Sequence, residues 1–531
     1  MQHFPTRFPS SLASSGTIGG IEDAIDSVFT PVTESVSGVI FAEVTVFGVT
    51  FPWIVAWLVV AGSVFSVYFG AIQLRGFWHA LSLVRASSRR DGESGDPGEV
   101  TPFRALTAAV SGTVGLGNIA GVAVAVTVGG PGATFWMILC GLLGMAIKFV
   151  ECTLGVKYRE VDEDGTIRGG PMQYLRRGLA DRGIPLLGRL LAPVFAVIIV
   201  TFALFGGNMF QINQTLAQLR GVTGGEDGWM AGPGAGLAFG VIASVLIAVV
   251  LLGGMKTIGA VTARLVPAMA AVYIGACFVV IGVNLGSVPG AIGSIVEGAF
   301  NPTGIGGGAI GVMIIGFQRA AFSNEAGLGS SPMAHAAVKT KHPVTEGFVA
   351  MLGPFIDTVI VCTITALTIV IAKPQSWLDA REAVANGEST PGGVTLTSDA
   401  FATVMPWFPY VLTVAVVLFA FSTIFTWTFY GEQGWAALFG RSKRSLTAYK
   451  LVVSACVIIG AMLTLGAVLD LADALLFVLA LFNVIGLYFM APIVKRELAS
   501  YTQHLRDRKA AGNGTKEATA RTPVVGHEIE G

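Results

Sequence analysis

The sequence predicts an all-α membrane protein with eleven spans. Hydrophobic residues make up 53% of the 531, and charged residues only 12%, whereas about a quarter of an ordinary soluble domain is charged. A membrane helix needs about 20 mostly apolar residues. Suitable stretches lie near 52 to 74, 103 to 127, 131 to 156, 190 to 218, 235 to 254, 258 to 284, 306 to 334, 345 to 372, 406 to 430, 446 to 466 and 470 to 492.

The residues ahead of the first span are polar and lack an apolar core, so we expect no cleaved signal peptide. Between residues 21 and 32, apolar side chains recur at helical spacing beside acidic ones. This pattern is typical of a helix that lies on the membrane surface. The five cysteines sit in apolar runs without CxxC spacing, which argues against a disulfide framework and a zinc site.

Lysine and arginine decide the orientation, because positive loops stay in the cytoplasm. Basic residues follow the first, third and fifth spans and recur in every second connection after them. The opposite side has only Arg7, Arg220, Lys373 and Arg381. The amino terminus is therefore expected outside and the carboxyl terminus inside. The outside loop from 373 to 405 is long enough to cap an entrance.

Two predicted spans contain residues that suit a continuous lipid-facing helix poorly. The second span carries "SGTVGLGNIAGVAVAV" from Ser111 to Val126, and the seventh carries "GFQRAAFSNEAGLGSSPMAH" from Gly316 to His335. Each has Gly-Leu-Gly next to polar residues, so each helix is expected to unwind there. One such segment alone would be read as close helix packing.

The two broken helices occupy matching places in two inverted halves. Five spans separate their starts, and this odd number means that they cross the membrane in opposite directions. Interrupted helices in corresponding positions indicate a substrate site near the midplane, where freed N–H groups bind a carboxylate and freed carbonyls bind a cation. The predicted parts are an extracellular segment (1–51), a leading span with its loop (52–102), two inverted repeats (103–284 and 285–494) and a disordered tail (495–531).

The chain resembles the alanine or glycine:cation symporter family, also called sodium:alanine symporters. The resemblance covers almost all of the transmembrane region. It is carried by "GTVGLGNIAGVA", "GGPGATFWMILCGLLGMAIKFVE", "GGPMQYL", "FSNEAGLGSSPMAHAA" and "DTVIVCTITAL". The resemblance implies a LeuT-type fold, in which two inverted five-helix repeats form the core, preceded here by one extra span.

The resemblance also implies positions for the ion sites. It assigns one sodium ion to the carbonyls of Ser111 and Val114 and to the hydroxyls of Ser422 and Thr423. These hydroxyls could instead bond back to their own helix. A possible second ion site would use Thr113 and Asn118.

For the substrate, the resemblance implies that its carboxylate meets the N–H groups of Gly115 and Gly117 beside Asn118. Polar residues of the fourth span and residues bordering the second break are further pocket candidates, with interhelical bonding or core packing as the alternatives. These candidates are Asn208, Gln211, Phe317, Phe322, Ser323 and Asn324.

Four charged residues lie deep in predicted spans, namely Arg319, Glu325, Asp357 and Glu432. A charge at the bilayer centre costs about 2.5 to 3.5 kcal/mol, so each is expected to be paired or to face water. Lys148 and Glu151 have the i, i+3 spacing of an ion pair within one helix.

These features predict sodium-coupled symport of alanine or glycine by alternating access in the cytoplasmic membrane of a prokaryote. Na⁺ is then the co-transported ion, the amino acid and the bilayer are the partners, no nucleic-acid partner is expected, and a monomer is expected. Proton coupling through Glu325 or Asp357 is the alternative within transport. An ion channel is a different class, but no pore-lining ring or repeated filter is present. An enzyme is not expected, because no Ser/His/Asp, HExxH or P-loop pattern stands at a credible location.

Overall fold

The computed structural model describes residues 31, 35–46, 49–88, 100–161, 167–232, 234–252, 254–301, 308–388, 393–463 and 465–520. Most of these residues are helical, and the strands form two short antiparallel hairpins. The hairpins pair β1 (Glu43–Val46) with β2 (Val49–Pro52) and β3 (Glu160–Val161) with β4 (Ile167–Arg168). The predicted surface helix from 21 to 32 lies, apart from residue 31, outside the described residues.

In chain order, the helices up to residue 283 include the first predicted break, and the helices after it include the second. The helices up to residue 283 are α2 (Trp53–Tyr68), α3 (Ile72–Arg75), α4 (Phe77–Ser88), α5 (Pro102–Thr113), η1 (Gly117–Gly121), α6 (Val122–Val128), α7 (Ala133–Lys157), α8 (Pro171–Asp181), α9 (Pro185–Phe202), η2 (Ala203–Met209), α10 (Phe210–Val222), η3 (Gly225–Asp227), α11 (Ala235–Leu252) and α12 (Gly254–Val283). The helices after it are η4 (Leu285–Ser287), α13 (Val288–Phe300), α14 (Gly308–Asn324), α15 (Ser331–His335), α16 (Pro343–Ala350), α17 (Leu352–Pro354), η5 (Phe355–Cys362), α18 (Thr363–Ala372), α19 (Gln375–Ala385), α20 (Gly393–Ala402), α21 (Phe408–Phe439), α22 (Lys443–Gly460) and α23 (Leu465–Ala520).

Each predicted apolar stretch falls on a helix or a broken helix of the structure. Among the described residues, five helices are long and apolar enough to cross a membrane, or seven if two sharply bent pairs each count as one span. The chain is therefore a mostly helical membrane protein with several spans. The count of eleven remains a prediction, because α2 and α11 are short for a bilayer.

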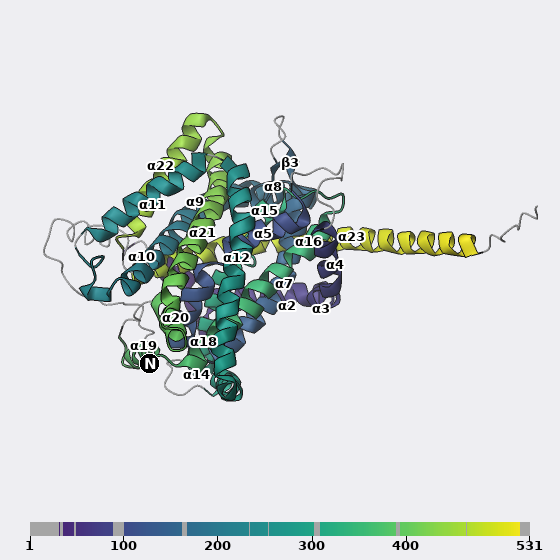
Figure 1. Cartoon of the computed structure of the whole chain (residues 1–531). Coiled ribbons are helices and arrows are strands. Elements are labelled where there is room, and N and C mark those ends of the chain that lie inside the picture. Colours follow the sequence, from purple (N-terminus) through teal and green to yellow (C-terminus); the bar gives the residue numbers. More distant parts are fainter. Residues whose placement is uncertain are drawn as a thin grey trace, which may run out of the picture.

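The helices pack into one bundle (Figure 1). Helix α7 contacts α14 and α16, and α9 contacts α8, α21 and α23. Apolar side chains such as Ile242 and Val249 of α11 are exposed, whereas Glu151 and Asp357 are fully buried. This arrangement suits a lipid environment, because charges in a membrane protein face its interior.

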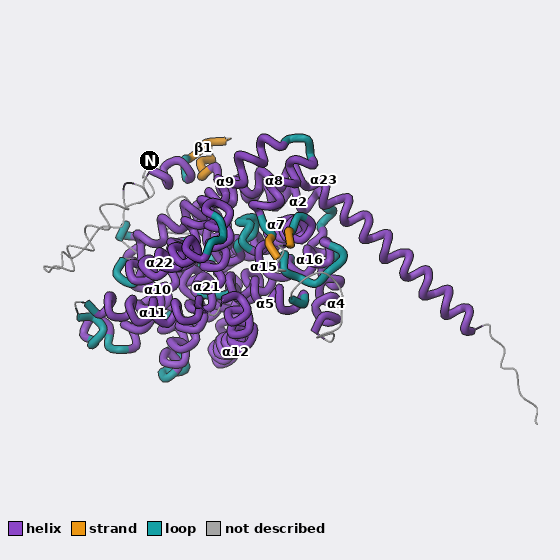
Figure 2. Tube along the Cα trace, turned by 90° about the horizontal axis from the view of Figure 1, so that it is seen from above, coloured by secondary structure: helices purple, strands orange, loops and turns teal. Residues whose placement is uncertain are grey.

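The segment after Lys495 corrects the prediction of a disordered tail, since α23 continues to Ala520. Figures 1 and 2 show this helix projecting from the bundle. A helix that is already nucleated in the bundle extends cheaply through residues with good helix propensity. Gln503 also donates to Asp507, four residues on, at 2.9 Å. Residues 521–531 lie outside the described part.

The long connection from 373 to 405 contains α19 and α20 instead of forming an irregular loop. The Thr397 hydroxyl of α20 donates to the Ile119 carbonyl of η1 at 3.1 Å. The Val394 N–H donates to the Gln214 side-chain oxygen of α10, also at 3.1 Å. Helix α20 is thereby bound directly to the first broken helix.

Candidate functional site

The first predicted break is present between α5 and η1. Helix α5 ends at Thr113, Val114 is extended, and the axes on either side are bent by 54°. A Cβ atom at Gly115 would lie 2.6 Å from the Thr423 hydroxyl oxygen of α21. Glycine therefore lets α21 approach the unwound backbone.

The second predicted break lies between α14 and α15. Glu325 has a left-handed φ of 56°, and Gly327 and Gly329 have φ values of 87° and 74°. These angles end α14 and leave a short non-helical segment before Ser331. Such a segment is tolerated at membrane depth only where protein or a water-filled cavity satisfies its polar groups.

Buried side chains of α7 and α23 satisfy this second segment. Glu151 accepts hydrogen bonds from the Gly329 N–H and from the Asn483 amide, both at 3.1 Å. The Asn483 amide also donates to the Gly327 carbonyl at 2.7 Å. Lys148 lies 3.5 Å from Glu151, which confirms the predicted ion pair.

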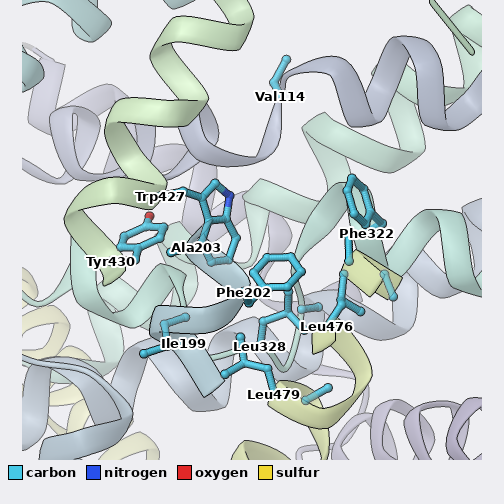
Figure 3. Packing of buried hydrophobic residues seen from close by; sticks show 14 of the residues in the cluster. Val114, Ile199, Phe202, Ala203, Phe322, Leu328, Trp427, Tyr430, Leu476 and Leu479 are labelled. Atoms are coloured by element: carbon cyan, nitrogen blue, oxygen red, sulfur yellow. The ribbon is translucent and has the colours of Figure 1, made fainter. Parts of the chain in front are cut away.

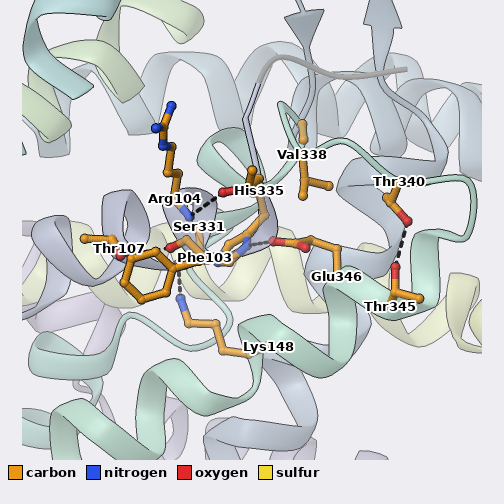
Figure 4. A network of polar contacts seen from close by, with 12 residues as sticks. Phe103, Arg104, Thr107, Lys148, Ser331, His335, Val338, Thr340, Thr345 and Glu346 are labelled. Carbon is orange, nitrogen blue, oxygen red and sulfur yellow. Dashed lines mark hydrogen bonds and ion pairs between the residues drawn. The ribbon is translucent and has the colours of Figure 1, made fainter. Parts of the chain in front are cut away.

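Lys148 additionally binds the ends of the same segment. Its ammonium donates to the Glu325 carbonyl at 3.1 Å and to the Ser331 hydroxyl. Figure 4 shows the contact between Lys148 and Ser331, with His335 facing Glu346 nearby. The irregular backbone is thus held by charged groups that are themselves buried.

The two breaks meet through Asn118 and Asp357. The Asn118 amide donates to the Ser323 hydroxyl at 3.0 Å and to Asp357 Oδ1 at 2.7 Å, and its oxygen accepts from the Gly115 N–H at 3.0 Å. Asp357 Oδ2 accepts from Ser323 at 2.6 Å and from Thr358 at 2.9 Å. This fully buried carboxylate of η5 is therefore bound by three neutral donors.

A small chamber lies beside this cluster, between both breaks, α9, η2, α10 and α21. Its lining residues are Gly112, Thr113, Gly117, Phe202, Gly206, Gln211, Phe322, Glu325 and Trp427. All of them are buried. Figure 3 shows Phe202 and Trp427 side by side, with Phe322 across from them and Val114 on the break. Of the predicted pocket residues, Gly117, Gln211 and Phe322 therefore line one space.

The residues predicted to bind the first sodium ion are all buried, but their two hydroxyl groups have different hydrogen-bond partners. The Thr423 hydroxyl points to the Ser111 carbonyl at 3.4 Å, and Val114 lies at the same break. The Ser422 hydroxyl instead donates to the Phe419 carbonyl of its own helix at 2.9 Å. Thr423 is thus the hydroxyl that joins α21 to the first break.

The two residues of the predicted second ion site are not joined to each other by a hydrogen bond. Asn118 belongs to the Asp357 cluster, whereas the Thr113 hydroxyl donates to the Val110 carbonyl of its own helix at 3.3 Å. Thr113 faces the chamber instead.

Six of the nine predicted substrate residues do not line the chamber. Gly115, Asn118 and Ser323 belong to the hydrogen-bonded cluster around Asp357. Phe317 and Asn324 border a separate apolar pocket against α7, and the Asn324 amide donates to Thr358 at 3.2 Å. Asn208 donates to the Thr428 hydroxyl at 3.4 Å, which links η2 to α21. Their roles as substrate ligands stay predictions.

The four charged residues within the spans differ in their surroundings. Arg319 forms an ion pair with Asp473 of α23, and its guanidinium lies 5.7 Å from the Phe322 ring centre. Glu432 is only partly buried. Glu325 accepts a hydrogen bond from the Ser330 hydroxyl at 2.5 Å and faces the chamber.

Sequence reasoning did not assign Phe202, Gly206, Glu325 and Trp427 to the chamber. Helices that are buried on nearly every side have no apolar period to show which residue faces a cavity. The paired glycines in "FGGN" are the sequence feature that could have pointed to this part of the chamber. They lie in the π-helix η2, and π-helical turns are frequent at functional sites.

The chain matches one family model and several known proteins. A model of the sodium:alanine symporter family matches residues 34–514. The sodium/alanine symporter AgcS of Methanococcus maripaludis is 39% identical over 391 residues, which cover 73% of this chain and 81% of AgcS. The amino-acid carrier protein AlsT of Bacillus subtilis is 34% identical over 404 residues, which cover 76% of this chain and 79% of AlsT. The crystal structure of MhsT in complex with L-phenylalanine aligns with a TM-score of 0.47 and 17% identity, covering 77% of this chain and 99% of MhsT. Because the family model spans most of the sequence, the chain belongs to the sodium:alanine symporter family.

Proposed function

We propose that this protein carries alanine or glycine into the cell with sodium, by alternating access across the cytoplasmic membrane of a prokaryote. Its family makes it a sodium-coupled amino-acid symporter and not an enzyme. The observation that carries the finer proposal is that two helix breaks, far apart in sequence, meet around one small buried chamber. The proposed architecture keeps eleven spans, with two inverted five-helix repeats of the LeuT type after a leading span.

The first sodium ion is proposed to bind where Thr423 faces the first break. The carbonyls of Ser111 and Val114 and the Thr423 hydroxyl are hard oxygen donors, and the Thr423 oxygen lies 3.4 Å from the Ser111 carbonyl. The Ser111 hydroxyl is buried and has no hydrogen-bond partner among the described residues. Ser422 can join after its hydroxyl rotates away from its own helix.

The second cation is proposed to bind at Asp357 and not at Thr113. Asp357 supplies a charge, and the hydroxyl oxygens of Ser323 and Thr358 lie within hydrogen-bonding distance of it, as does the Asn118 amide. A buried carboxylate is costly without a cation or strong donors. A bound sodium ion would neutralise Asp357 while keeping both breaks together.

The substrate is proposed to lie with its carboxylate at the N–H of Gly117, in the first turn of η1, where N–H groups have no partner inside the helix. The Gly115 N–H, which was also predicted to bind the carboxylate, already donates to the Asn118 side chain at 3.0 Å. The Phe202 and Trp427 ring centres are 4.6 Å apart, and Phe322 packs on Phe210 at 5.1 Å. These packed rings bound a space that holds no more than about one water molecule as it stands, so an amino acid fits only if they move apart. A hydrogen or methyl side chain is therefore favoured.

Coupling to one sodium ion is energetically sufficient. A zwitterionic substrate with one Na⁺ carries one net positive charge inward. Across 100 mV this charge gains about 2.3 kcal/mol, which corresponds to roughly fifty-fold accumulation before any sodium gradient is added.

Uptake of labelled alanine into proteoliposomes, with sodium or with choline outside, tests the proposed function. We expect uptake only with sodium, and inward current that saturates at carrier rates. Strong uptake without sodium would favour proton coupling through Glu325 or Asp357. Currents far above carrier turnover would favour a channel. Glycine, serine and leucine as competitors would measure the size limit of the chamber.

Replacing Thr423 with Ala is expected to raise the sodium concentration for half-maximal uptake by roughly 10- to 100-fold, since a polar contact to a charged group contributes about 1.5 to 3 kcal/mol. Ser422→Ala is the matched control, and its effect should be smaller because that hydroxyl bonds within its own helix. An unchanged sodium dependence in Thr423→Ala would remove this residue from the ion site.

A further inference from the structure

One wall of the chamber carries a carboxylate that the proposed ion sites do not use. Glu325 follows α14 directly, is 3% exposed and faces the same space as Gly117 and Gln211. Its left-handed φ of 56° is unusual for a residue with a side chain. Strained backbone of this kind clusters at ligand-binding sites, so a role for this side chain in binding has to be considered.

The described contacts around Glu325 fix its position without an ion pair to its carboxylate. Lys148 donates to its main-chain carbonyl at 3.1 Å, and Ser330 donates a neutral hydrogen bond to its carboxylate at 2.5 Å. The ammonium of Lys148 lies 3.5 Å from Glu151. Among the residues that the structure describes, no Lys, Arg or His side chain forms an ion pair with the Glu325 carboxylate.

A second acceptor faces the chamber without a donor. The Gln211 side-chain oxygen is buried and has no hydrogen-bond partner in the described part of the chain. It also lies 3.8 Å from the place that a Cβ atom of Gly115 would take, next to the first break. Buried polar atoms in proteins are normally paired. The chamber therefore presents two acceptors, one of them charged, in the same small space as the first break.

We propose that the Glu325 carboxylate binds the ammonium group of the transported amino acid, with the Gln211 oxygen as a second acceptor. An alkylammonium has three N–H donors and no acceptor, which matches these two groups. The carboxylate and ammonium of an α-amino acid share one carbon, so their binding groups must line one small space, as Gly117 and Glu325 do. This inference rests on the proposed function and adds to it the group that selects amino acids over other small carboxylates.

The consequence for specificity is that lactate and propionate, which lack an ammonium group, should be excluded although they are as small as alanine. A site that buries a charged acceptor rejects an analogue without the matching donor, because the acceptor then stays unpaired. The proposed sodium sites use other contacts, namely Thr423 with the Ser111 carbonyl and Asp357 with Asn118. They therefore do not depend on the contact between Glu325 and the ammonium group.

Glu325→Gln in the purified full-length protein tests the inference, with labelled alanine binding measured at saturating sodium. Alanine affinity should fall by at least about 30-fold, because truncating one side of a buried charged pair costs about 2 kcal/mol or more. Binding of labelled sodium without alanine should stay at the wild-type level. The preference for alanine over lactate should fall by at least the same factor as the alanine affinity, because the unpaired charge that rejects lactate is also removed.

Two control variants separate recognition from folding. Ser330→Ala removes the hydrogen bond that holds Glu325 but keeps the carboxylate, so its loss of alanine affinity should be clearly smaller. Glu432→Gln makes the same acid-to-amide change at a half-buried position of α21 outside the chamber, and should bind like the wild type.

Unchanged alanine affinity in Glu325→Gln would overturn the inference. An equal loss in Ser330→Ala would make Glu325 a clamp for its own segment, and a parallel loss of sodium binding would assign it to the ion. If the wild type itself shows no sodium-dependent alanine binding, the proposed function fails and not only this assignment.

Discussion

Asp357→Asn is expected to lower sodium-driven alanine uptake by at least about 100-fold, since breaking a buried charged interaction costs about 3 to 5 kcal/mol. The carboxylate accepts from Asn118, Ser323 and Thr358. An amide at this position retains one acceptor oxygen and turns an NH₂ group toward other donors. The variant also removes the negative charge proposed to balance the second cation. Initial uptake rates at several sodium concentrations measure both effects.

The folding of Asp357→Asn has to be checked separately by size-exclusion chromatography and by the thermal midpoint in detergent. Glu432→Gln is again the matched acid-to-amide control. Thr358→Ala removes one of the three donors, so its uptake should lie between those of Asp357→Asn and the wild type. Normal uptake with normal sodium dependence in a folded Asp357→Asn protein would exclude Asp357 from ion binding.

Lys148→Met is expected to destabilise the protein by about 3 to 5 kcal/mol, because it leaves a buried charge without its partner. Glu151 is fully buried and lies 3.5 Å from the Lys148 ammonium. The substitution also removes the donor to the Glu325 carbonyl, at the start of the second break. The thermal midpoint of the detergent-purified protein, and the amount of folded protein recovered from membranes, should both fall.

The double variant Lys148→Met with Glu151→Gln should recover part of this loss. It leaves no unpaired charge at position 151, while the glutamine oxygen can still accept from the Gly329 N–H and the Asn483 amide. A double variant that is less stable than Lys148→Met would show that Glu151 acts through these hydrogen bonds and not through its charge. A single variant as stable as the wild type would contradict the expected role of the pair.

By itself, the sequence determined the membrane setting, the positions of the helices, the two breaks and the family. Each of these properties depends on residues that lie close together in the sequence. A bilayer demands long apolar runs, and glycines beside polar residues weaken a helix wherever it packs. The predicted Lys148–Glu151 pair was also local, because residues three apart share one helix face. The helical stretch from 495 to 520 was missed because a polar composition was taken for disorder, although the preceding helix nucleates it.

Only the tertiary structure decided which side chains share a space. Phe317 and Asn324 lie near the second break in sequence but face α7, whereas Phe322 and Glu325 of the same segment face the chamber. Asn118 was predicted beside Thr113 and instead meets Asp357, more than two hundred residues away. A helix that is buried on all sides has no polar face, so the sequence does not show how the helix is rotated about its own axis. The direction of each side chain is therefore set by the helices packed against it and by the angle of the break.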